Sequence, residues 1–219
     1  MSVAGSAPVL DLIDDFEDGN HAVRLINSPR RDGLWDVFND GSGTQVPTPG
    51  KFVPVPLGKA SAPYAGDTFA AYTKGSGFTS YGAVLKVDMR DWPVFADTPQ
   101  YDASAYSGIS FRARIEKGAS PLLRIRFVSG DTDPRGNKCK APESNPPQSE
   151  LCFNHFFADV VLGTTWALYE VDFSSDFAQG KGGKLFPRIS PDTMYGLEFN
   201  LPGGAPFELF LDDLSFIRK

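Results

Sequence analysis

The stretch ISFRARIE, residues 109–116, alternates strictly between apolar and polar side chains. Because successive side chains of a β-strand point to opposite faces of the sheet, this alternation predicts a strand with one buried and one polar face. The stretch PLLRIRFVSG, residues 121–130, follows the short segment KGAS and alternates in the same way. The two stretches therefore predict a β-hairpin. Its polar face is expected to carry four arginines, namely Arg112, Arg114, Arg124 and Arg126.

Three later segments have the same period of two and are flanked by Gly, Pro or Ser: WALYEVDFSS (166–175), YGLEFNLPG (195–203) and FELFLDDLSFI (207–217). They bring carboxylates to the polar faces, among them Glu170 and Glu198. If these strands neighbour the arginine pair, the polar face carries cross-strand ion pairs. That face is then either an ordinary solvated sheet surface or the polar floor of a cleft.

Length and composition favour an all-β protein. The chain has 219 residues, of which 41% are hydrophobic and 13% aromatic, and it contains 22 Gly and 18 Pro. This size supports one substantial core, and the mixture favours strands and turns over long helices. The sequence shows no repeat of fixed period, no heptad pattern and no linker. We therefore predict one domain over residues 1–219, folded as a two-sheet antiparallel β-sandwich of jelly-roll type.

The charge of the chain narrows the range of partners. Lys and Arg total 21 against 27 Asp and Glu, which gives a formal net charge of -6 at pH 7. Without a basic run to neutralise phosphates, nucleic acid is not an expected partner. No apolar stretch is long enough to span a bilayer, so no membrane association is expected. Residues 1–15 lack the basic and apolar regions of a signal peptide, so export would require that a signal had been removed.

The sequence contains two cysteines, Cys139 and Cys152, on either side of the Pro- and Asn-rich segment KAPESNPPQSEL. A disulfide between them would close this segment into a loop and contribute about 3 kcal/mol in the chain-entropy model. Such a bond persists in an oxidising compartment, which favours a secreted protein. Two free buried thiols are the alternative. A zinc site has little support, because His21 and His155 are the only histidines.

The two ends of the chain carry a family resemblance. DDFEDGN (14–20) and FLDDLSFIRK (210–219) closely resemble the first and last strands of carbohydrate-binding modules with the galactose-binding-like jelly roll. WDVFNDG (35–41), YDASAYSGISFRAR (101–114) and TTWALYEVDF (164–173) resemble further strands of such modules, in the same order along the chain. The resemblance implies that the opening and closing strands lie together and that the protein binds carbohydrate.

In that family, acidic residues from the opening and closing strands commonly hold a structural Ca²⁺. The resemblance carries this role to Asp15, Glu17 and Asp212, with Asp67 in the segment YAGDTF as an addition. The chemistry agrees, because Ca²⁺ takes about six to eight oxygen ligands and clustered carboxylates repel one another without a cation. A solvated acidic turn over residues 14–18 is the alternative.

Signals for catalysis are weak. The sequence has no GxSxG or HExxH motif, and a histidine-dependent triad would need His21 or His155. The best acidic pair is Glu170 and Asp172 in YEVDF, two carboxylates of the kind that a retaining glycosidase uses. Jelly-roll glycosidases that resemble this arrangement carry a third acidic residue further along the strand, where this chain has residues 173–175, Phe-Ser-Ser. Pairing of the two carboxylates with the arginines is the preferred interpretation.

Carbohydrate recognition needs an aromatic face for the apolar side of a sugar ring and a few polar groups for its hydroxyls. The predicted ligand-binding residues are Tyr81, Trp35, Arg126, Asp131, His155, Glu198 and Asn200. Trp92 is a further aromatic candidate near a loop. For each aromatic residue, packing in the core is the alternative.

The sequence therefore predicts a secreted, non-catalytic module that is stabilised by calcium and holds an attached enzyme near a polysaccharide. The preferred ligand is a neutral β-glucan or a related plant polysaccharide. The arginines raise the hypothesis of an anionic polymer, which the negative net charge of the protein opposes. Two other classes of function stay open: a jelly-roll glycoside hydrolase or lyase, and a protein-interaction or assembly domain of the same fold.

Overall fold

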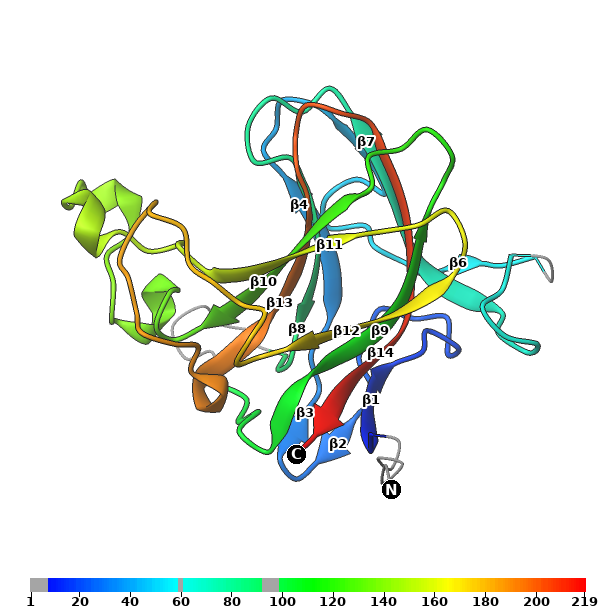
Figure 1. The fold of residues 1–219 in the computed structure, drawn as a ribbon, viewed down its shortest axis with the longest axis horizontal. Helices are drawn as coiled ribbons and strands as arrows, with labels where there is room; N and C mark the ends of the chain where they lie inside the picture. The colour runs from blue at the N-terminus through cyan, green and yellow to red at the C-terminus, as the bar shows by residue number, and fades with distance from the viewer. Residues whose placement is uncertain (1–7, 59–60, 92–98) are drawn as a thin grey trace, which may run out of the picture.

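The structure is a computed structural model that describes residues 8–58, 61–91 and 99–219 (Figure 1). Its strands form two antiparallel sheets that pack face to face, so the predicted two-sheet β-sandwich is confirmed. Within the described residues one sheet has seven strands and the other has five. The helices described are single 3-10 turns, and none is long and apolar enough to cross a membrane.

The seven-stranded sheet has the order β12-β9-β14-β7-β5, with β1 added to β14 and β6 added to β7. Its strands are β1 (Leu10–Asp14), β5 (Thr44–Val46), β6 (Val55–Pro56), β7 (Phe69–Ser76), β9 (Tyr106–Ile115), β12 (Ala167–Asp172) and β14 (Phe207–Arg218). Antiparallel pairing of β1 with β14 puts Leu10 opposite Ile217. The two ends of the chain therefore lie side by side (Figure 1), as the family resemblance implied.

The five-stranded sheet has the order β11-β10-β13-β8-β4. Its strands are β4 (Trp35–Asn39), β8 (Ala83–Asp88), β10 (Leu122–Ser129), β11 (Phe156–Val161) and β13 (Met194–Leu201). A small separate pair is formed by β2 (Ile26–Asn27) and β3 (Arg30–Arg31). The 3-10 turns are η2 (Pro134–Gly136), η3 (Pro142–Ser144), η4 (Gln148–Glu150) and η5 (Pro191–Thr193).

The predicted hairpin of residues 109–116 and 121–130 is wrong. Strand β9 pairs with β12 and β14, whereas β10 pairs with β11 and β13, so the segment between them crosses from one sheet to the other. Alternation specifies which side chains are buried but not which strand is the neighbour, and both strands face the same core. The predicted cluster of four arginines is therefore divided between the two outer faces of the molecule.

One core lies between the sheets and joins them through aromatic contacts. Phe111 of β9 meets Phe199 of β13 with ring centroids 5.6 Å apart. Trp35 of β4, in the same sheet as Phe199, stacks on the Phe199 ring with centroids 6.1 Å apart. All three side chains are almost completely buried, and burying a large apolar side chain typically contributes about 1.5–3 kcal/mol. These contacts fix the distance between the sheets.

Two long loops project together from one side of the sandwich, the segments that follow β10 and β12 (yellow-green and gold in Figure 1). Cys139 and Cys152 form a disulfide in the first loop, which confirms that prediction and excludes the alternatives of free thiols and a zinc site at these sulfurs. The second loop is tied to the first where the backbone N–H of Lys184 donates to the carbonyl of Leu151 at 2.9 Å. The disulfide loop is thus braced by its neighbour.

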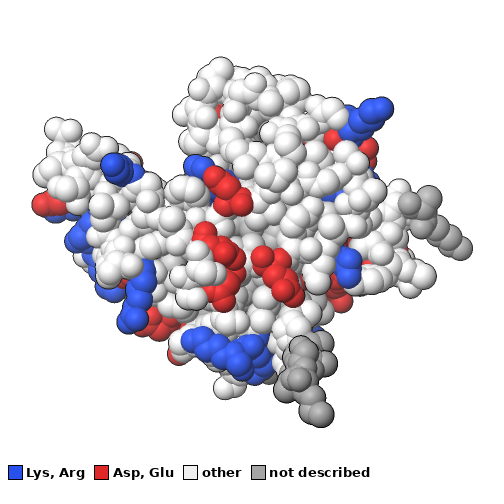
Figure 2. All heavy atoms as spheres, in the orientation of Figure 1, with Lys and Arg blue, Asp and Glu red and all other residues white. Residues whose placement is uncertain are grey.

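Charges are mixed on the surface. Figure 2 shows Lys and Arg in small groups among acidic and uncharged side chains on the face drawn. Several of these charges are paired, for example Arg218 with Asp11 at 2.7 Å and Arg30 with Asp32 at 2.6 Å. This pattern is unlike the continuous basic stripe of a nucleic-acid-binding surface.

Candidate functional site

The outer face of the five-stranded sheet carries a row of side chains that crosses every strand. Pairing between neighbouring strands aligns one residue from each, from β11 through β10, β13 and β8 to β4. We call this set the cross-strand row; its members are Phe157, Arg126, Glu198, Lys86 and Asp36. The opposite faces of these strands supply the core, so the row faces outward.

Two adjoining hollows lie over this row and form a groove. The larger has a volume of about 710 Å³, and its lining includes Tyr81, Arg126 and Phe157. The smaller has a volume of about 320 Å³ and extends the groove towards β8. Phe153 and Glu198 line both hollows. We call the two hollows together the Tyr81–Phe153 groove.

Two exposed aromatic rings belong to the groove. Tyr81 is 40% exposed and packs against Phe38 with ring centroids 6.3 Å apart. Phe153 is 52% exposed, although aromatic side chains usually bury most of their surface. Each ring therefore offers apolar surface to a ligand. Tyr81 was predicted, whereas sequence reasoning missed Phe153.

The disulfide loop positions Phe153. This residue directly follows Cys152 and adopts a left-handed backbone conformation with φ of 65°, which is uncommon for a residue other than glycine. Its backbone N–H donates to the carbonyl of Thr132 at 2.8 Å. An aromatic residue immediately after a loop-closing cysteine was the signal in the sequence that could have identified it.

The floor of the groove is made of ion pairs. Arg126 of β10 lies 3.4 Å from Glu198 of β13, as the predicted cross-strand pairing requires. Arg124 makes two 2.7 Å hydrogen bonds to Asp159, and these bonds raise the pKa of its guanidinium. The guanidinium carbon of Arg124 also lies 3.9 Å from the centre of the Phe157 ring. Opposite charges thus neutralise one another locally while polar atoms remain at the surface.

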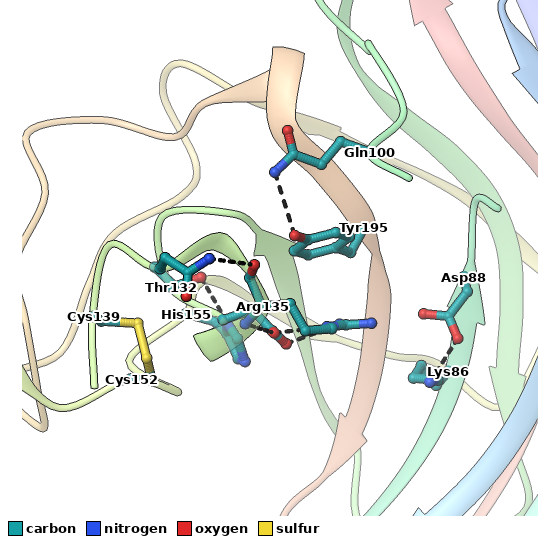
Figure 3. Close-up of polar contacts among 11 residues, drawn as sticks. Lys86, Asp88, Gln100, Thr132, Arg135, Cys139, Cys152, His155 and Tyr195 are labelled. Carbon is teal, nitrogen blue, oxygen red and sulfur yellow. Dashed lines mark hydrogen bonds and ion pairs between the residues drawn. A yellow bond between two sulfur atoms is a disulfide. The ribbon is translucent and has the colours of Figure 1, made fainter. Parts of the chain in front are cut away.

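His155 lines both hollows of the groove and is almost fully buried. Its Nδ1 is 2.7 Å from the hydroxyl of Thr132, close to the disulfide (Figure 3). Burial lowers the pKa of His155, and the carboxylate of Glu198 opposes this shift only partly. The imidazole is therefore neutral near pH 7, and it forms part of a rigid, uncharged wall.

A second set of ion pairs lines the smaller hollow. Asp133 binds Arg135 through two hydrogen bonds of 2.7 and 2.8 Å, and the guanidinium lies over the ring of Tyr195 at 4.2 Å. Lys86 pairs with Asp88 at 2.6 Å (Figure 3). As in the larger hollow, each cation has an acidic neighbour. The groove as a whole offers donors and acceptors with little net charge.

Three predicted ligand-binding residues have structural roles instead. Trp35 is 2% exposed in the core. Asn200 is buried and donates from its amide to the carbonyls of Tyr81 and Ala83, at 2.9 and 3.1 Å. Asp131 is buried and binds Lys138 at 2.6 Å, which anchors the disulfide loop.

Trp35 lies on the core side of β4, whereas Asn200 and Asp131 are buried by contacts with other segments, and residue type alone showed neither. The groove nevertheless brings together four of the predicted residues: Tyr81, Arg126, His155 and Glu198. Trp92 lies outside the described residues.

The comparisons with known proteins concern the fold. No protein-family model matches the sequence, and no curated protein matches it. The family 11 carbohydrate-binding module of the cellulosomal cellulase Lic26A-Cel5E of Clostridium thermocellum is similar in structure, with a TM-score of 0.58 and 15% identity over 98% of this chain and 97% of that chain. The chain has the fold of a carbohydrate-binding module.

Two further solved structures agree. The family 11 module from Clostridium thermocellum in complex with a β-1,3-1,4-mixed-linked tetrasaccharide has a TM-score of 0.56 and 16% identity, over 97% of this chain and 98% of that chain. A family 30 carbohydrate-binding module has a TM-score of 0.53 and 11% identity, over 94% of this chain and 87% of that chain. Identities this low establish a common fold, so the ligand has to be inferred from the groove itself.

A second feature of this module fold is an acidic cluster where β14 leaves its regular pairing with β9. A β-bulge follows Asp212, and Asp213 adopts a left-handed backbone with φ of 51°. Asp212 is 1% exposed, and its Oδ2 is buried with no hydrogen-bond partner. Burial, together with the nearby carboxylates of Asp213, Asp67 and Glu17, raises the pKa of Asp212 to about 8.

The predicted calcium ligands therefore lie near one another, together with Asp213, which sequence reasoning missed. Some of their oxygens already accept hydrogen bonds: Glu17 Oε1 accepts from Thr68 and Phe69, and Asp67 Oδ2 accepts from Tyr64. Within residues 8–58, 61–91 and 99–219, no three Asp, Glu, His or Cys side chains are already arranged to hold a metal ion. The buried Oδ2 of Asp212 has no hydrogen-bond partner, so it has a free capacity to accept.

The acidic pair considered for catalysis lies away from the groove. Glu170 and Asp172 belong to β12 in the seven-stranded sheet, and Glu170 faces Ser110 rather than an arginine. Asp172 Oδ1 accepts from the backbone N–H groups of Ser174 and Ser175, at 2.7 and 3.0 Å, so it caps a turn. Their predicted pairing with the arginines is therefore wrong, because β12 aligns these residues with Ser110 and Gly108 instead.

Proposed function

We propose that this protein is a non-catalytic module that binds a polysaccharide in the Tyr81–Phe153 groove. The observation that carries the proposal is the combination of two exposed aromatic rings with a floor of mutually neutralised ion pairs. An aromatic face packs against the apolar C–H side of a sugar ring, and charged groups make strong hydrogen bonds to its hydroxyls. The groove offers both within one hollow.

The ligand is a neutral glycan. Arg124 and Arg126 are engaged by Asp159 and Glu198, so a polyanion would have to compete with existing carboxylates. A hydroxyl group can use the remaining donors and acceptors of each pair without breaking it. The preferred class is a β-glucan or a related plant polysaccharide. Because one similar family 11 module was solved in complex with a β-1,3-1,4-mixed-linked tetrasaccharide, such oligosaccharides are suitable first probes.

A structural Ca²⁺ at the acidic cluster belongs to the same proposal. The residues that would hold it are Asp212, whose buried Oδ2 is unpartnered, and Asp15, Glu17, Asp67 and Asp213 around it. A divalent cation there would neutralise clustered carboxylates and link β1, β14 and the segment before β7. Some of these side chains would have to change rotamer to reach it. The cluster lies in the seven-stranded sheet, so its role would be stability.

Secretion and attachment to an enzyme complete the proposed function. The disulfide favours an oxidising compartment. One similar module belongs to a cellulosomal cellulase, which is consistent with a targeting role here. A module of this kind would raise the effective concentration of an attached enzyme near its polymer.

The experiment that tests the function is affinity electrophoresis in gels that contain mixed-linkage β-glucan, xylan, mannan, pectin or alginate. We expect retardation by a neutral β-linked polymer, and its loss on Tyr81→Ala. Glu170→Ala on the opposite sheet is the matched control and should be retarded like the wild type. Retardation by pectin or alginate alone would contradict the neutral ligand class.

Assays for released reducing ends and unsaturated products, run in parallel, test the hydrolase and lyase alternative. Product formation that Glu170→Gln abolishes would contradict the non-catalytic assignment. Absence of retardation by every polymer would favour a protein-interaction or assembly domain.

A further inference from the structure

A third hollow lies next to the Tyr81–Phe153 groove, at the β4 edge of the five-stranded sheet. It has a volume of about 440 Å³, and its lining includes Asp36, Gly50 and Phe52. Lys86 and Asp88 line both this hollow and the smaller hollow of the groove. The depression in this face therefore continues beyond the Tyr81–Phe153 groove as far as β4, the edge strand of the sheet.

The cross-strand row links the three hollows in order. Arg126 lines the first hollow, Glu198 the first and second, Lys86 the second and third, and Asp36 the third. Neighbouring strands are about 4.8 Å apart, so the four steps from β11 to β4 span about 19 Å. A ligand that followed the row would cross all five strands roughly at right angles.

The charges along the row alternate in sign. Arg126 is followed by Glu198, then by Lys86 and then by Asp36. A neutral hydroxylated chain meets donors and acceptors in turn along such a row. The two cations of the row are matched by two carboxylates, so a polyanion would gain no net attraction. The alternation therefore extends the preference for a neutral ligand into the third hollow.

The third hollow has the composition of a small-ligand site, with apolar and polar groups together. Phe52 and Trp35 line its apolar side but are only 6% and 2% exposed, so Asp36 and Lys86 supply the groups that a ligand would contact. Asp36 Oδ1 accepts from the backbone N–H groups of Val37 and Gly50, at 2.7 and 3.1 Å, which hold its carboxylate in one position. A preorganised group binds a ligand with little loss of conformational freedom.

We propose that the third hollow is an outer subsite for the same polysaccharide chain. The ligand follows the cross-strand row, and Asp36 and Lys86 bind sugar units beyond those held in the Tyr81–Phe153 groove. This proposal rests on the proposed function and specifies its substrate: a linear neutral glycan. With roughly one sugar ring for each strand spacing, it needs about four consecutive units or more.

The test is isothermal titration calorimetry with purified β-1,3-1,4-glucan oligosaccharides, from disaccharide to hexasaccharide. We expect the hexasaccharide to bind at least about tenfold more tightly than the trisaccharide, which corresponds to about 1.4 kcal/mol. Asp36→Ala should bring the ratio of the two affinities close to one. Glu170→Ala is the control and should preserve the ratio.

A second variant separates binding from folding. Asp36 also holds Gly50, so Asp36→Ala can disturb the loop after β5. Lys86→Met keeps the apolar stem and removes the ammonium group, and it should reduce the same ratio. Amide chemical shifts of residues 36 and 86 supply an independent readout, because the hexasaccharide should move them and the disaccharide should not.

The outcomes distinguish the two proposals. Equal affinities for the trisaccharide and the hexasaccharide would overturn the outer subsite and leave the Tyr81–Phe153 groove as the binding site. A length dependence that neither Asp36→Ala nor Lys86→Met changes would also overturn it. Absence of binding by every oligosaccharide and polymer would overturn the proposed function as well.

Discussion

The indole Nε1 of Trp35 donates a 2.7 Å hydrogen bond to Oδ2 of Asp14, in the core between the sheets. Both side chains are almost completely buried, and Asp14 Oδ1 accepts a second bond from the backbone N–H of Phe16. The bond joins β4 of one sheet to the end of β1 in the other. A tryptophan that was expected to face the ligand therefore stabilises the sandwich.

Trp35→Phe should destabilise the protein and leave binding of a trisaccharide in the Tyr81–Phe153 groove intact, because Trp35 lines the third hollow but not that groove. The substitution keeps an aromatic ring but leaves a buried carboxyl oxygen without its donor, which typically costs about 1–3 kcal/mol. Urea unfolding measures the loss of stability, and calorimetry with the oligosaccharides measures binding. A large loss of affinity without a loss of stability would show that Trp35 does contact the ligand.

Tyr81→Ala and Phe153→Ala should each weaken binding without unfolding the protein, because 40% of Tyr81 and 52% of Phe153 are exposed and neither belongs to the core. We expect a loss of about 1–2 kcal/mol for each, or about five- to thirtyfold in affinity. Leu168→Ala is a matched control, since Leu168 is 48% exposed on the opposite sheet. Unchanged affinity in both aromatic variants would place the ligand elsewhere.

Removing the disulfide should affect both stability and binding. Replacing Cys139 and Cys152 together with serine should lower the free energy of unfolding by about 3 kcal/mol. Affinity should also fall, because Phe153 loses the constraint on the residue before it. Binding at saturating ligand, measured well below the unfolding temperature, separates the two effects. Unaltered affinity would show that the hydrogen bond from the backbone of Phe153 to Thr132 is enough to hold the Phe153 ring in its binding position.

Asp212→Asn should abolish stabilisation by calcium. In the wild type, Ca²⁺ should raise the melting temperature above its value in a chelator, because it binds the folded state alone. Asparagine removes the charge that would hold the ion, and it also removes an unpaired buried carboxylate. The variant should therefore melt higher than the wild type in chelator at pH 8. An equal effect of Ca²⁺ on both proteins would contradict a site at Asp212.

Stability in chelator should fall as the pH rises from about 5 to about 8. Burial raises the pKa of Asp14 to about 7 and that of Asp212 to about 8, from an ordinary value of 3.8. Between these limits the two carboxyls bind more protons in the folded protein than in the unfolded chain. They outweigh His155, whose lowered pKa has the opposite effect, so deprotonation favours unfolding. The double variant Asp14→Asn with Asp212→Asn should show a flatter dependence. A rise in stability over this range would contradict the assignment.

The local sequence pattern determined the position of several strands, the disulfide and one ion pair. Alternation over residues 109–116, 121–130 and 207–217 predicted strands that the structure contains, because which side chains are buried in a strand is a property of neighbouring residues. The presence of two cysteines predicted a disulfide, because closing a short loop between Cys139 and Cys152 has a small entropic cost. The opposite charges of Arg126 and Glu198 also predicted an ion pair between neighbouring strands, and the structure contains it.

The tertiary structure determined which strands are neighbours and which side chains are exposed. Two strands of a hairpin and two strands in facing sheets have the same alternation of apolar and polar residues. Only the pairing with distant strands places Arg112 in one sheet and Arg126 in the other. The exposure of Phe153 depends on how the disulfide loop lies, and the burial of Trp35 depends on which face of β4 meets the other sheet. Both are settled by contacts between residues far apart in the sequence. The register of five strands placed Asp36 in line with Arg126, and a continuous row exists only when the sheet has formed.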